Sequence, residues 1–181
     1  QIAQCIERIY APLNRAEGCA PEDVIDLVQD AMGPVELSVV MNEERINSAL
    51  AIVEKAKQLS KSLKAEDFHE LLSCHEAEAM VLSAELHYRA SLLRKESRGW
   101  FYREDYPQQD NDNWLKWIIA QNVEGEMSFT TEDVPVERWP IKPEGTQLKR
   151  VPVSEEEIAS PLYKYFTMPM TEADPAKYAA V

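Results

Sequence analysis

The chain has 181 residues, of which 45% are hydrophobic, enough for one domain with a buried core. Its net charge of −13 repels phosphate backbones and disfavours a nucleic-acid partner, which leaves solubility or a basic partner surface as explanations. The chain holds only 5 Gly and has no GxGxxG, GxxxxGK[ST] or GxSxG motif, so a phosphate-cradling loop is disfavoured too.

Two helices are predicted in the first 41 residues. The first has an apolar face repeating at three and four residues, formed by Ile2, Cys5, Ile6, Ile9 and Tyr10. Pro21 opens the second at a position where its missing N–H costs nothing, and the buried stripe is Val24, Leu27, Val28, Ala31 and Met32. Residues 35–41 fit a short strand or, preferably, a helical or irregular lead-in. The chain starts inside a helical pattern at Gln1, which fits a piece of a longer protein or a separate subunit.

Two long helices follow. Asn42 is the expected N-cap of the first, which runs to about Leu63 with the stripe Ile46, Ala49, Leu50, Val53, Ala56, Leu59 and Leu63. After a turn at Lys64 and Ala65, the longest helix is predicted from about Glu66 to Ser97, with Gly99 as its left-handed C′ residue. Its predicted seam is Phe68, Leu72, His75, Ala79, Leu82, Leu86, Ala90 and Leu93.

The predicted fold class is mainly α. Because short turns make long helices antiparallel neighbours, residues 1–120 are interpreted as an up-down-up three-helix bundle domain that ends in a charged, aromatic stretch. After Gly99 the period changes, and residues 114–121 and 126–131 predict a small β-hairpin. Residues 121–181 are the second predicted part, containing the hairpin turn and an extended Pro-rich tail that could act as an arm against a partner.

Metal chemistry is disfavoured. Glu66 and His69 form one Glu-x-x-His motif, whereas a carboxylate-bridged di-iron bundle needs two. His75 lies on the predicted seam and is interpreted as a core or interface histidine bonded to a neighbour. His87 lies off the seam and is interpreted as a surface residue.

The cysteines do not indicate a reactive or disulfide-bonded site. Cys5, Cys19 and Cys74 are an odd number without CxxC spacing or a basic neighbour, which disfavours zinc, a disulfide framework and a nucleophile. A reducing, cytoplasmic location fits best. The apolar runs are too short for a membrane span, so we expect none in this chain.

The most informative stretch is residues 94–116, RKESRGWFYREDYPQQDNDNWLK. In one interpretation its charges pair with each other while its aromatic residues cover the end of the bundle. In the other the stretch is an interface, because aromatic and Arg side chains anchor interdomain and protein–protein contacts. The candidate contact residues are Glu96, Ser97, Arg98, Gly99, Trp100, Tyr102, Arg103, Asp105, Tyr106, Asp110, Asn113 and Trp114.

Three motifs in this stretch resemble one family. Residues 95–99 (KESRG), 102–107 (YREDYP) and 110–116 (DNDNWLK) are similar to the C-terminal domain of the succinate dehydrogenase/fumarate reductase flavoproteins. That family includes adenylylsulfate reductase alpha subunits and L-aspartate oxidases, and the resemblance covers roughly residues 1–120. One departure is that Gly99 precedes Trp100-Phe101-Tyr102 where succinate dehydrogenases carry Ala-His, which favours an adenylylsulfate reductase-like relative.

The resemblance implies a fold, a cofactor and partners. The fold would be a spectrin-repeat-like bundle that follows FAD-binding and capping domains, with FAD bound there and not in this chain. The implied function is to brace those domains in an FAD-dependent oxidoreductase and to contact an iron–sulfur electron-transfer subunit. The chain would not be catalytic alone, and partner subunits could hold it at the inner face of a membrane. The alternative is a stand-alone helical adaptor that binds a protein through residues 94–116.

Overall fold

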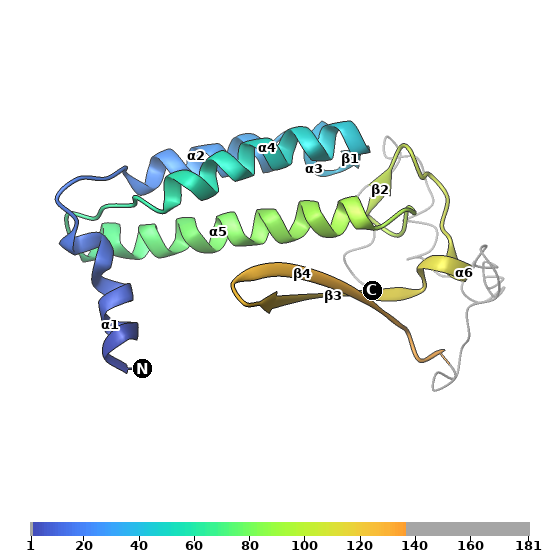
Figure 1. The fold of residues 1–181 in the computed structure, drawn as a ribbon. Coiled ribbons are helices and arrows are strands. Elements are labelled where there is room, and N and C mark those ends of the chain that lie inside the picture. Colours follow the sequence, from blue (N-terminus) through green and yellow to red (C-terminus); the bar gives the residue numbers. More distant parts are fainter. Residues whose placement is uncertain (1, 137–181) are drawn as a thin grey trace, which may run out of the picture. The chain divides into compact units, whose positions relative to one another are not determined.

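Residues 2–136 are described by a computed structural model; residues 1 and 137–181, which include the predicted Pro-rich arm, lie outside the described part. The prediction of a mainly α chain with a small hairpin is confirmed (Figure 1). The elements are α1 Ile2–Tyr10, the 3-10 helix η1 Ala11–Asn14, α2 Pro21–Met32, α3 Val35–Ser38, β1 Val40–Met41, α4 Glu43–Ser60, α5 Phe68–Leu93, β2 Tyr102–Arg103, α6 Asn111–Trp114, β3 Lys116–Val123 and β4 Glu126–Asp133.

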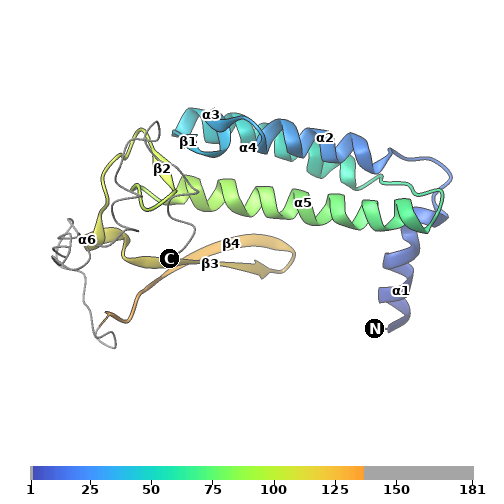
Figure 2. The ribbon, with the colours of Figure 1, turned by 180° about the vertical axis from the view of Figure 1, so that it is seen from behind.

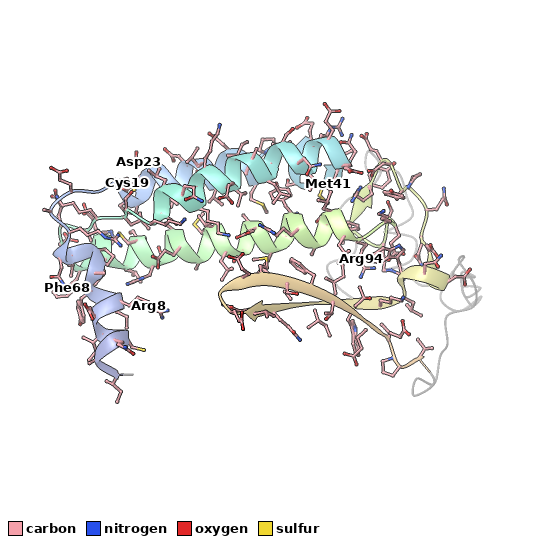
Figure 3. The ribbon with its side chains drawn as sticks, viewed as in Figure 1. Arg8, Cys19, Asp23, Met41, Phe68 and Arg94 are labelled. Atoms are coloured by element: carbon pink, nitrogen blue, oxygen red, sulfur yellow. The ribbon has the colours of Figure 1, made fainter. Side chains whose placement is uncertain are left out.

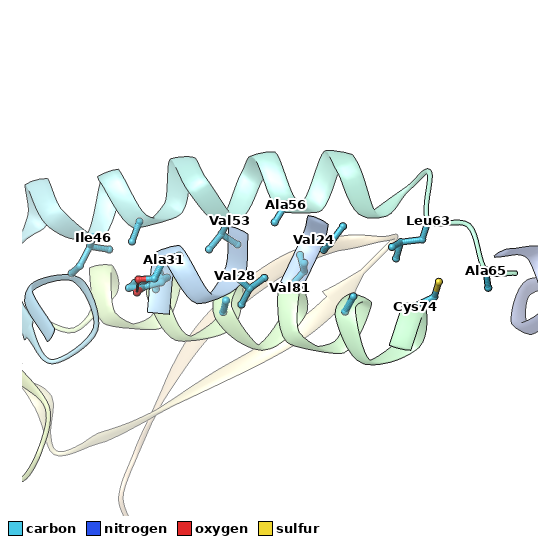
Figure 4. Packing of buried hydrophobic residues seen from close by; sticks show 14 of the residues in the cluster. Val24, Val28, Ala31, Ile46, Val53, Ala56, Leu63, Ala65, Cys74 and Val81 are labelled. Atoms are coloured by element: carbon cyan, nitrogen blue, oxygen red, sulfur yellow. Dashed lines mark hydrogen bonds between the residues drawn. The ribbon is translucent and has the colours of Figure 1, made fainter. Parts of the chain in front are cut away.

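Three helices enclose the hydrophobic core. α2, α4 and α5 each pack against the other two, and the stripes predicted for α2 and α4 are confirmed as core-facing (Figure 4). Alanines such as Ala49 and Ala77 are fully buried where the helices meet, which allows close approach of the backbones. The Tyr88 hydroxyl donates to the Ala31 carbonyl at 2.7 Å, so this buried polar group is satisfied.

The seam predicted for α5 is wrong. The inner stripe, which faces the core, is Leu71, Cys74, Ala77, Val81, Ala84 and Tyr88. The predicted seam faces away from the core and forms an outer stripe, in which Phe68, Leu72 and Leu82 are 72%, 58% and 53% exposed. Three further members of this stripe are half-buried: His75, Leu86 and Ala90. Both series recur at three and four residues, so the period alone does not distinguish them. Three helices in close contact favour the series with the smaller side chains. His87 Nε2 is buried, which also corrects the prediction of a surface histidine.

The bounds of α5 also differ from the prediction. The helix begins after Asp67, whose side chain accepts hydrogen bonds from the N–H groups of His69 and Glu70 at 2.8 and 2.9 Å. It ends at Leu93, because the next residue has an extended backbone with φ −76° and ψ 120°. Gly99 therefore is not the C′ residue of this helix, although it does have the predicted left-handed conformation.

Residues 35–41 contain both of the predicted alternatives. α3 occupies the first four, and β1 then pairs in parallel with β2, with Val40 opposite Tyr102 and Met41 opposite Arg103. Asn42 caps α4 as predicted, with its Oδ1 accepting from the Arg45 N–H at 2.9 Å. The short β1–β2 ladder therefore joins the start of α4 to the segment that follows α5.

α1 has its predicted apolar face but buries none of it. Ile2 is 79% exposed and Ile6 52%. The helix is attached through its last turn, where the Ile9 carbonyl lies 3.0 Å from His75 Nε2 and the Tyr10 ring meets the Phe68 ring edge-on. His75 is therefore bonded to a neighbour, as predicted, at the contact between α1 and α5 (Figures 1 and 3).

The predicted hairpin is confirmed. β3 and β4 pair antiparallel from Lys116 opposite Asp133 to Val123 opposite Glu126. The two turn residues, Glu124 and Gly125, have positive φ values of 54° and 94°, as a type I′ turn requires. Gly125 takes the larger value without strain because it has no side chain. The hairpin runs beside α5, on the side away from α2 and α4 (Figures 1 and 2). Within residues 2–136 no helix is both long and apolar enough to cross a bilayer.

Candidate docking loop

The two ends of the segment between α5 and β3 are tied together by Arg94. This residue lies at the C-terminal end of α5 (Figure 3) and donates from Nη2 to the Lys116 carbonyl at 2.8 Å and from Nη1 to the Trp114 carbonyl at 3.1 Å. Its guanidinium also lies over the Trp114 ring, 5.5 Å from the centroid. Residues 94–116 thus form a closed unit, which we call the docking loop.

A buried carboxylate lies at the centre of the docking loop. Glu96 has no exposed surface and accepts from the guanidiniums of Arg94 and Arg98, the latter through two bonds of 2.9 Å. The Asp110 N–H donates to the same carboxylate at 2.9 Å, and Arg98 also reaches the Asn111 side-chain oxygen at 2.7 Å. A buried carboxylate is stable only with such donors around it, so Glu96 fixes the positions of both arginines.

A second ion pair joins the docking loop to two core helices. Arg103 is 1% exposed; it donates to both carboxylate oxygens of Asp105 and, from Nη1, to the Ser91 carbonyl in the last turn of α5 at 2.6 Å. The Glu43 N–H, at the start of α4, donates to Asp105 at 3.0 Å. The bonds from Arg103, and then that from Glu43, lower the pKa of Asp105 despite its partial desolvation.

Further polar contacts hold the docking loop against α4 and keep it folded. The Ser97 hydroxyl accepts from the Arg103 N–H at 2.9 Å and donates to the Tyr106 carbonyl at 2.8 Å. Glu104 pairs with Arg45 at 2.8 Å on the surface. These contacts attach the loop to the helical core at several points along its length.

One turn of the docking loop projects into solvent. The backbones of Arg98 and Phe101 exchange two hydrogen bonds of 2.8 and 3.0 Å around Gly99 and Trp100. Gly99 has φ +59° and the next residue does not have a positive φ, which is the pattern of a type II′ turn. Trp100 is 97% exposed and Tyr102 is 41% exposed.

The structure divides the predicted contact residues into three groups. Glu96, Arg98, Arg103 and Asp105 pair with each other inside the loop, as the pairing interpretation predicts. In the second group, the rings of Tyr106 and Trp114 stack against the guanidiniums of Arg103 and Arg94. The other members make local hydrogen bonds or turns: Ser97, Gly99, Asp110 and Asn113. Bonds from Asn113 lower the pKa of Asp110. Only Trp100 and Tyr102 in the predicted set combine a large aromatic ring with high exposure.

Several anchors of the loop are absent from the prediction. Ser91 lies 12 residues from Arg103, and Glu43 lies 62 residues from Asp105. A carbonyl and a backbone N–H leave no trace in a residue pattern, so no spacing could have identified them. Arg94 binds the carbonyls of Trp114 and Lys116 at the other end of the loop, and a residue pattern could not have identified these partners either.

The described residues do not bring together the side chains that a metal site needs. No group of three His, Cys, Asp or Glu side chains in residues 2–136 could hold a metal ion, and Glu66 and His69 lie exposed at the start of α5. The three cysteines are free. Burial, followed by the charge of Glu70, raises the pKa of Cys74, which keeps this sulfur a thiol and a poor nucleophile.

Known proteins similar to this chain are flavoproteins. The sequence model of the fumarate reductase flavoprotein C-terminal family matches residues 28–148. An uncharacterised FAD-dependent oxidoreductase of Methanocaldococcus jannaschii is 29% identical over 118 residues, which are 64% of this chain and 21% of that protein. A CoM/CoB fumarate reductase polypeptide of Methanothermobacter marburgensis is 30% identical over 103 residues, 55% of this chain and 18% of that polypeptide.

The fold is also similar to that of two solved reductase structures. Adenylylsulfate reductase from Archaeoglobus fulgidus matches with a TM-score of 0.66 and 25% identity over 77% of this chain and 25% of that one. Quinol fumarate reductase from E. coli shares the fold, with a TM-score of 0.69 and 23% identity over the same shares. The chain thus spans about a fifth of the length of the curated relatives. Since the family's model matches most of the chain, this protein belongs to the fumarate reductase flavoprotein C-terminal family.

Proposed function

We propose that this chain is the C-terminal domain of the flavoprotein subunit of an FAD-dependent oxidoreductase of the succinate dehydrogenase, fumarate reductase or adenylylsulfate reductase type. It braces the flavin-binding and capping domains through the predicted contact residues of the docking loop, and it contacts an iron–sulfur electron-transfer subunit in the cytoplasm. FAD supplies the redox chemistry elsewhere in the polypeptide. The described residues do not fit FAD, because they have no glycine-rich turn between a strand and a helix to receive its pyrophosphate.

One observation carries this proposal: the large apolar side chains that the helical core leaves in water. In the outer stripe of α5, Phe68, Leu72 and Leu82 are more than half exposed, whereas Leu86 is half-buried beside the hairpin, and α1 adds a second exposed apolar face. Exposed apolar patches on one protein normally mark a contact surface. The exposed Trp100 adds the residue type most enriched at the energetic centres of interfaces.

The electrostatics of the docking loop support the same function. Its arginines already have carboxylate partners, so the loop does not need another molecule to stabilise its charges. A surface preorganised in this way loses little conformational entropy when it docks. The paired charges therefore hold the aromatic contact residues in place, and the aromatic residues make the contact.

The test uses the 181-residue chain and the full-length flavoprotein that carries it. Trp100→Ala should leave the isolated chain within about 0.5 kcal/mol of the wild-type free energy of unfolding, since the side chain touches little. In the full-length protein the same change should lower flavin retention and activity. Trp117→Ala, on the half-exposed face of the hairpin, is the matched control.

Two results would contradict the proposal. Stoichiometric binding of FAD by the isolated 181-residue chain would mean that the chain has a flavin site of its own. Equal flavin retention by the full-length wild type and its Trp100→Ala variant would mean that this turn braces nothing.

A further inference from the structure

An open groove of about 530 Å³ runs between α2 and α5, two helices that pack against each other in the helical core (Figure 2). Six side chains of these helices form most of its lining: Val28, Met32, Ala79, Met80, Ser83 and Ala84. Two exposed residues complete the lining, Gln29 from α2 and Glu76 from α5. The groove borders the outer stripe at Ala79 but contains no residue of the docking loop or the hairpin.

The groove offers apolar packing surface and few hydrogen-bonding groups. The backbone groups of its walls are bonded within α2 and α5, so an extended strand would find no main-chain partner there. The Ser83 hydroxyl already donates to the Ala79 carbonyl at 2.8 Å, so little remains to orient a small polar ligand. A helix brings its own backbone bonds with it and can insert its apolar side chains between two other helices. The groove therefore fits a helix.

The two walls combine fixed and adaptable side chains. Val28 and Ala84 are 4% and 2% exposed and belong to the hydrophobic core, so core packing holds the two walls in place. Met32 and Met80 are half-buried, one on each helix. Methionine side chains are flexible and adapt to the shape of a partner, which is why they are common at binding surfaces.

The two helices that form the groove carry carboxylates and no basic side chain beside it. α2 contains no Lys or Arg, and α5 contains none before Arg89. Glu22 and Asp26 lie seven and three residues before Gln29 and so share its side of α2, while Glu76 lines the groove from α5. Within residues 2–136 these three carboxylates are exposed and form no ion pair. An apolar groove with an acidic edge favours a partner that combines apolar and basic side chains.

We propose that this groove binds an amphipathic helix of another polypeptide. The apolar residues of that helix recur at three and four positions and pack between Met32 and Met80. Lys or Arg residues beside this apolar stripe face Glu76 and the carboxylates of α2. A second copy of this chain is disfavoured as the occupant, because it would bring the same acidic helices to the groove. The groove can bind such a helix whether or not the chain acts as a flavoprotein domain, so the two proposals can fail independently.

The methionine methyl signals of the 181-residue chain test this site directly, because two of them come from the groove. The probe is a synthetic helix of about 14 residues made of Leu and Lys, with Leu at three- and four-residue spacing. It should shift the Met32 and Met80 signals saturably, whereas those of Met41, in the core, and Met127, in the hairpin, should stay in place. The same peptide with Glu in place of Lys should bind about tenfold more weakly or not at all.

Two substitutions at exposed positions of the groove should weaken binding of the Leu/Lys peptide. Ala79→Arg places a long, positively charged side chain in the groove and should reduce the affinity about tenfold or more. Ala51→Arg, at an exposed position of α4, adds the same charge outside the groove and should change the affinity less than about twofold. Glu76→Lys should reduce the affinity about threefold or more, and Glu54→Lys, also exposed on α4, is its matched control.

Several results would overturn the proposal. These are the absence of a saturable shift at Met32 and Met80, an equal shift with the Leu/Glu peptide, or equal binding by Ala79→Arg. If circular dichroism shows that Ala79→Arg has lost helix, Glu76→Lys takes its place in this comparison.

Two further results would overturn it by identifying a different occupant. Met32 and Met80 signals that change with protein concentration, without the peptide, would show that a second copy fills the groove. Met168 and Met170 signals that move together with the groove signals when the peptide is added would show that residues 137–181 of this chain fill it.

Discussion

Both sides of α5 carry an apolar stripe, but one stripe is buried in the core and the other is largely exposed. The inner stripe holds Ala77 and Ala84, both 2% exposed or less, and packs against α2 and α4. The outer stripe holds larger residues, such as Phe68 and Leu72, and leaves more than half of these two side chains in water. Small residues let helix backbones approach, whereas large exposed apolar residues are typical of a contact surface. The comparison shows that apolar character and period do not by themselves separate the core side of this helix from its exposed side.

Leu71 and Leu72 are the sharpest way to break this comparison, because they are the same residue type at adjacent positions, 6% and 58% exposed. Leu71→Asp places an unpaired carboxylate in the core and removes apolar contacts. We expect a loss of about 3 kcal/mol or more in the free energy of unfolding, measured by urea titration of the helical circular dichroism. A loss below 1 kcal/mol would contradict the assignment of the inner stripe.

Just after the end of α5, buried ion pairs take the place of apolar contacts, and Glu96→Gln tests how much these ion pairs stabilise the fold. The variant leaves two arginines without their shared carboxylate, so we expect a loss of about 2–4 kcal/mol in the same urea titration. Glu104→Gln, whose partner Arg45 is accessible to water, should cost less than about 1 kcal/mol. Similar losses for both variants would show that the buried cluster is no more important than a surface pair.

Tyr88 tests the polar group within the inner stripe. Tyr88→Phe removes the bond to the Ala31 carbonyl and should cost about 1–2 kcal/mol at pH 7. Burial raises the pKa of Tyr88 to about 12, so folding favours the neutral phenol. Its contribution is complete below pH 10 and is lost as the pH rises toward 12. The wild type should therefore lose stability between pH 10 and 12, whereas Tyr88→Phe should not. An equal loss in Tyr88→Phe would contradict the contribution of the buried phenol.

The smallest effect is expected at His87, which lies on neither stripe. Burial lowers the pKa of His87, so folding favours the neutral imidazole. Its contribution is present above pH 6.5 and is lost as the pH falls through that value toward the lower pKa of the folded state. His87→Leu should lose less stability between pH 7.5 and 5 than the wild type. His69→Gln, at an exposed position, should lose as much as the wild type does.

The sequence predicts the fold correctly where a segment has a single apolar pattern, which fits only one kind of element and one buried side. α2 and α4 each have a single apolar stripe, and the hairpin has β-prone runs on both sides of Gly125. α5 has two stripes with the same period, so its core side could not be chosen from periodicity. In the docking loop the residue types predict an important segment, but the burial of Glu96 and Arg103 depends on carbonyls and N–H groups far along the chain.

The most direct test of the outer stripe as a docking surface is Leu72→Asp, measured in the isolated chain and in the full-length flavoprotein. The isolated chain should stay within about 0.5 kcal/mol of the wild type, because Leu72 is already in water. The full-length variant should release its flavin at a lower temperature than the wild type. A loss in the isolated chain like that of Leu71→Asp, or an unchanged flavin-release temperature, would contradict the account.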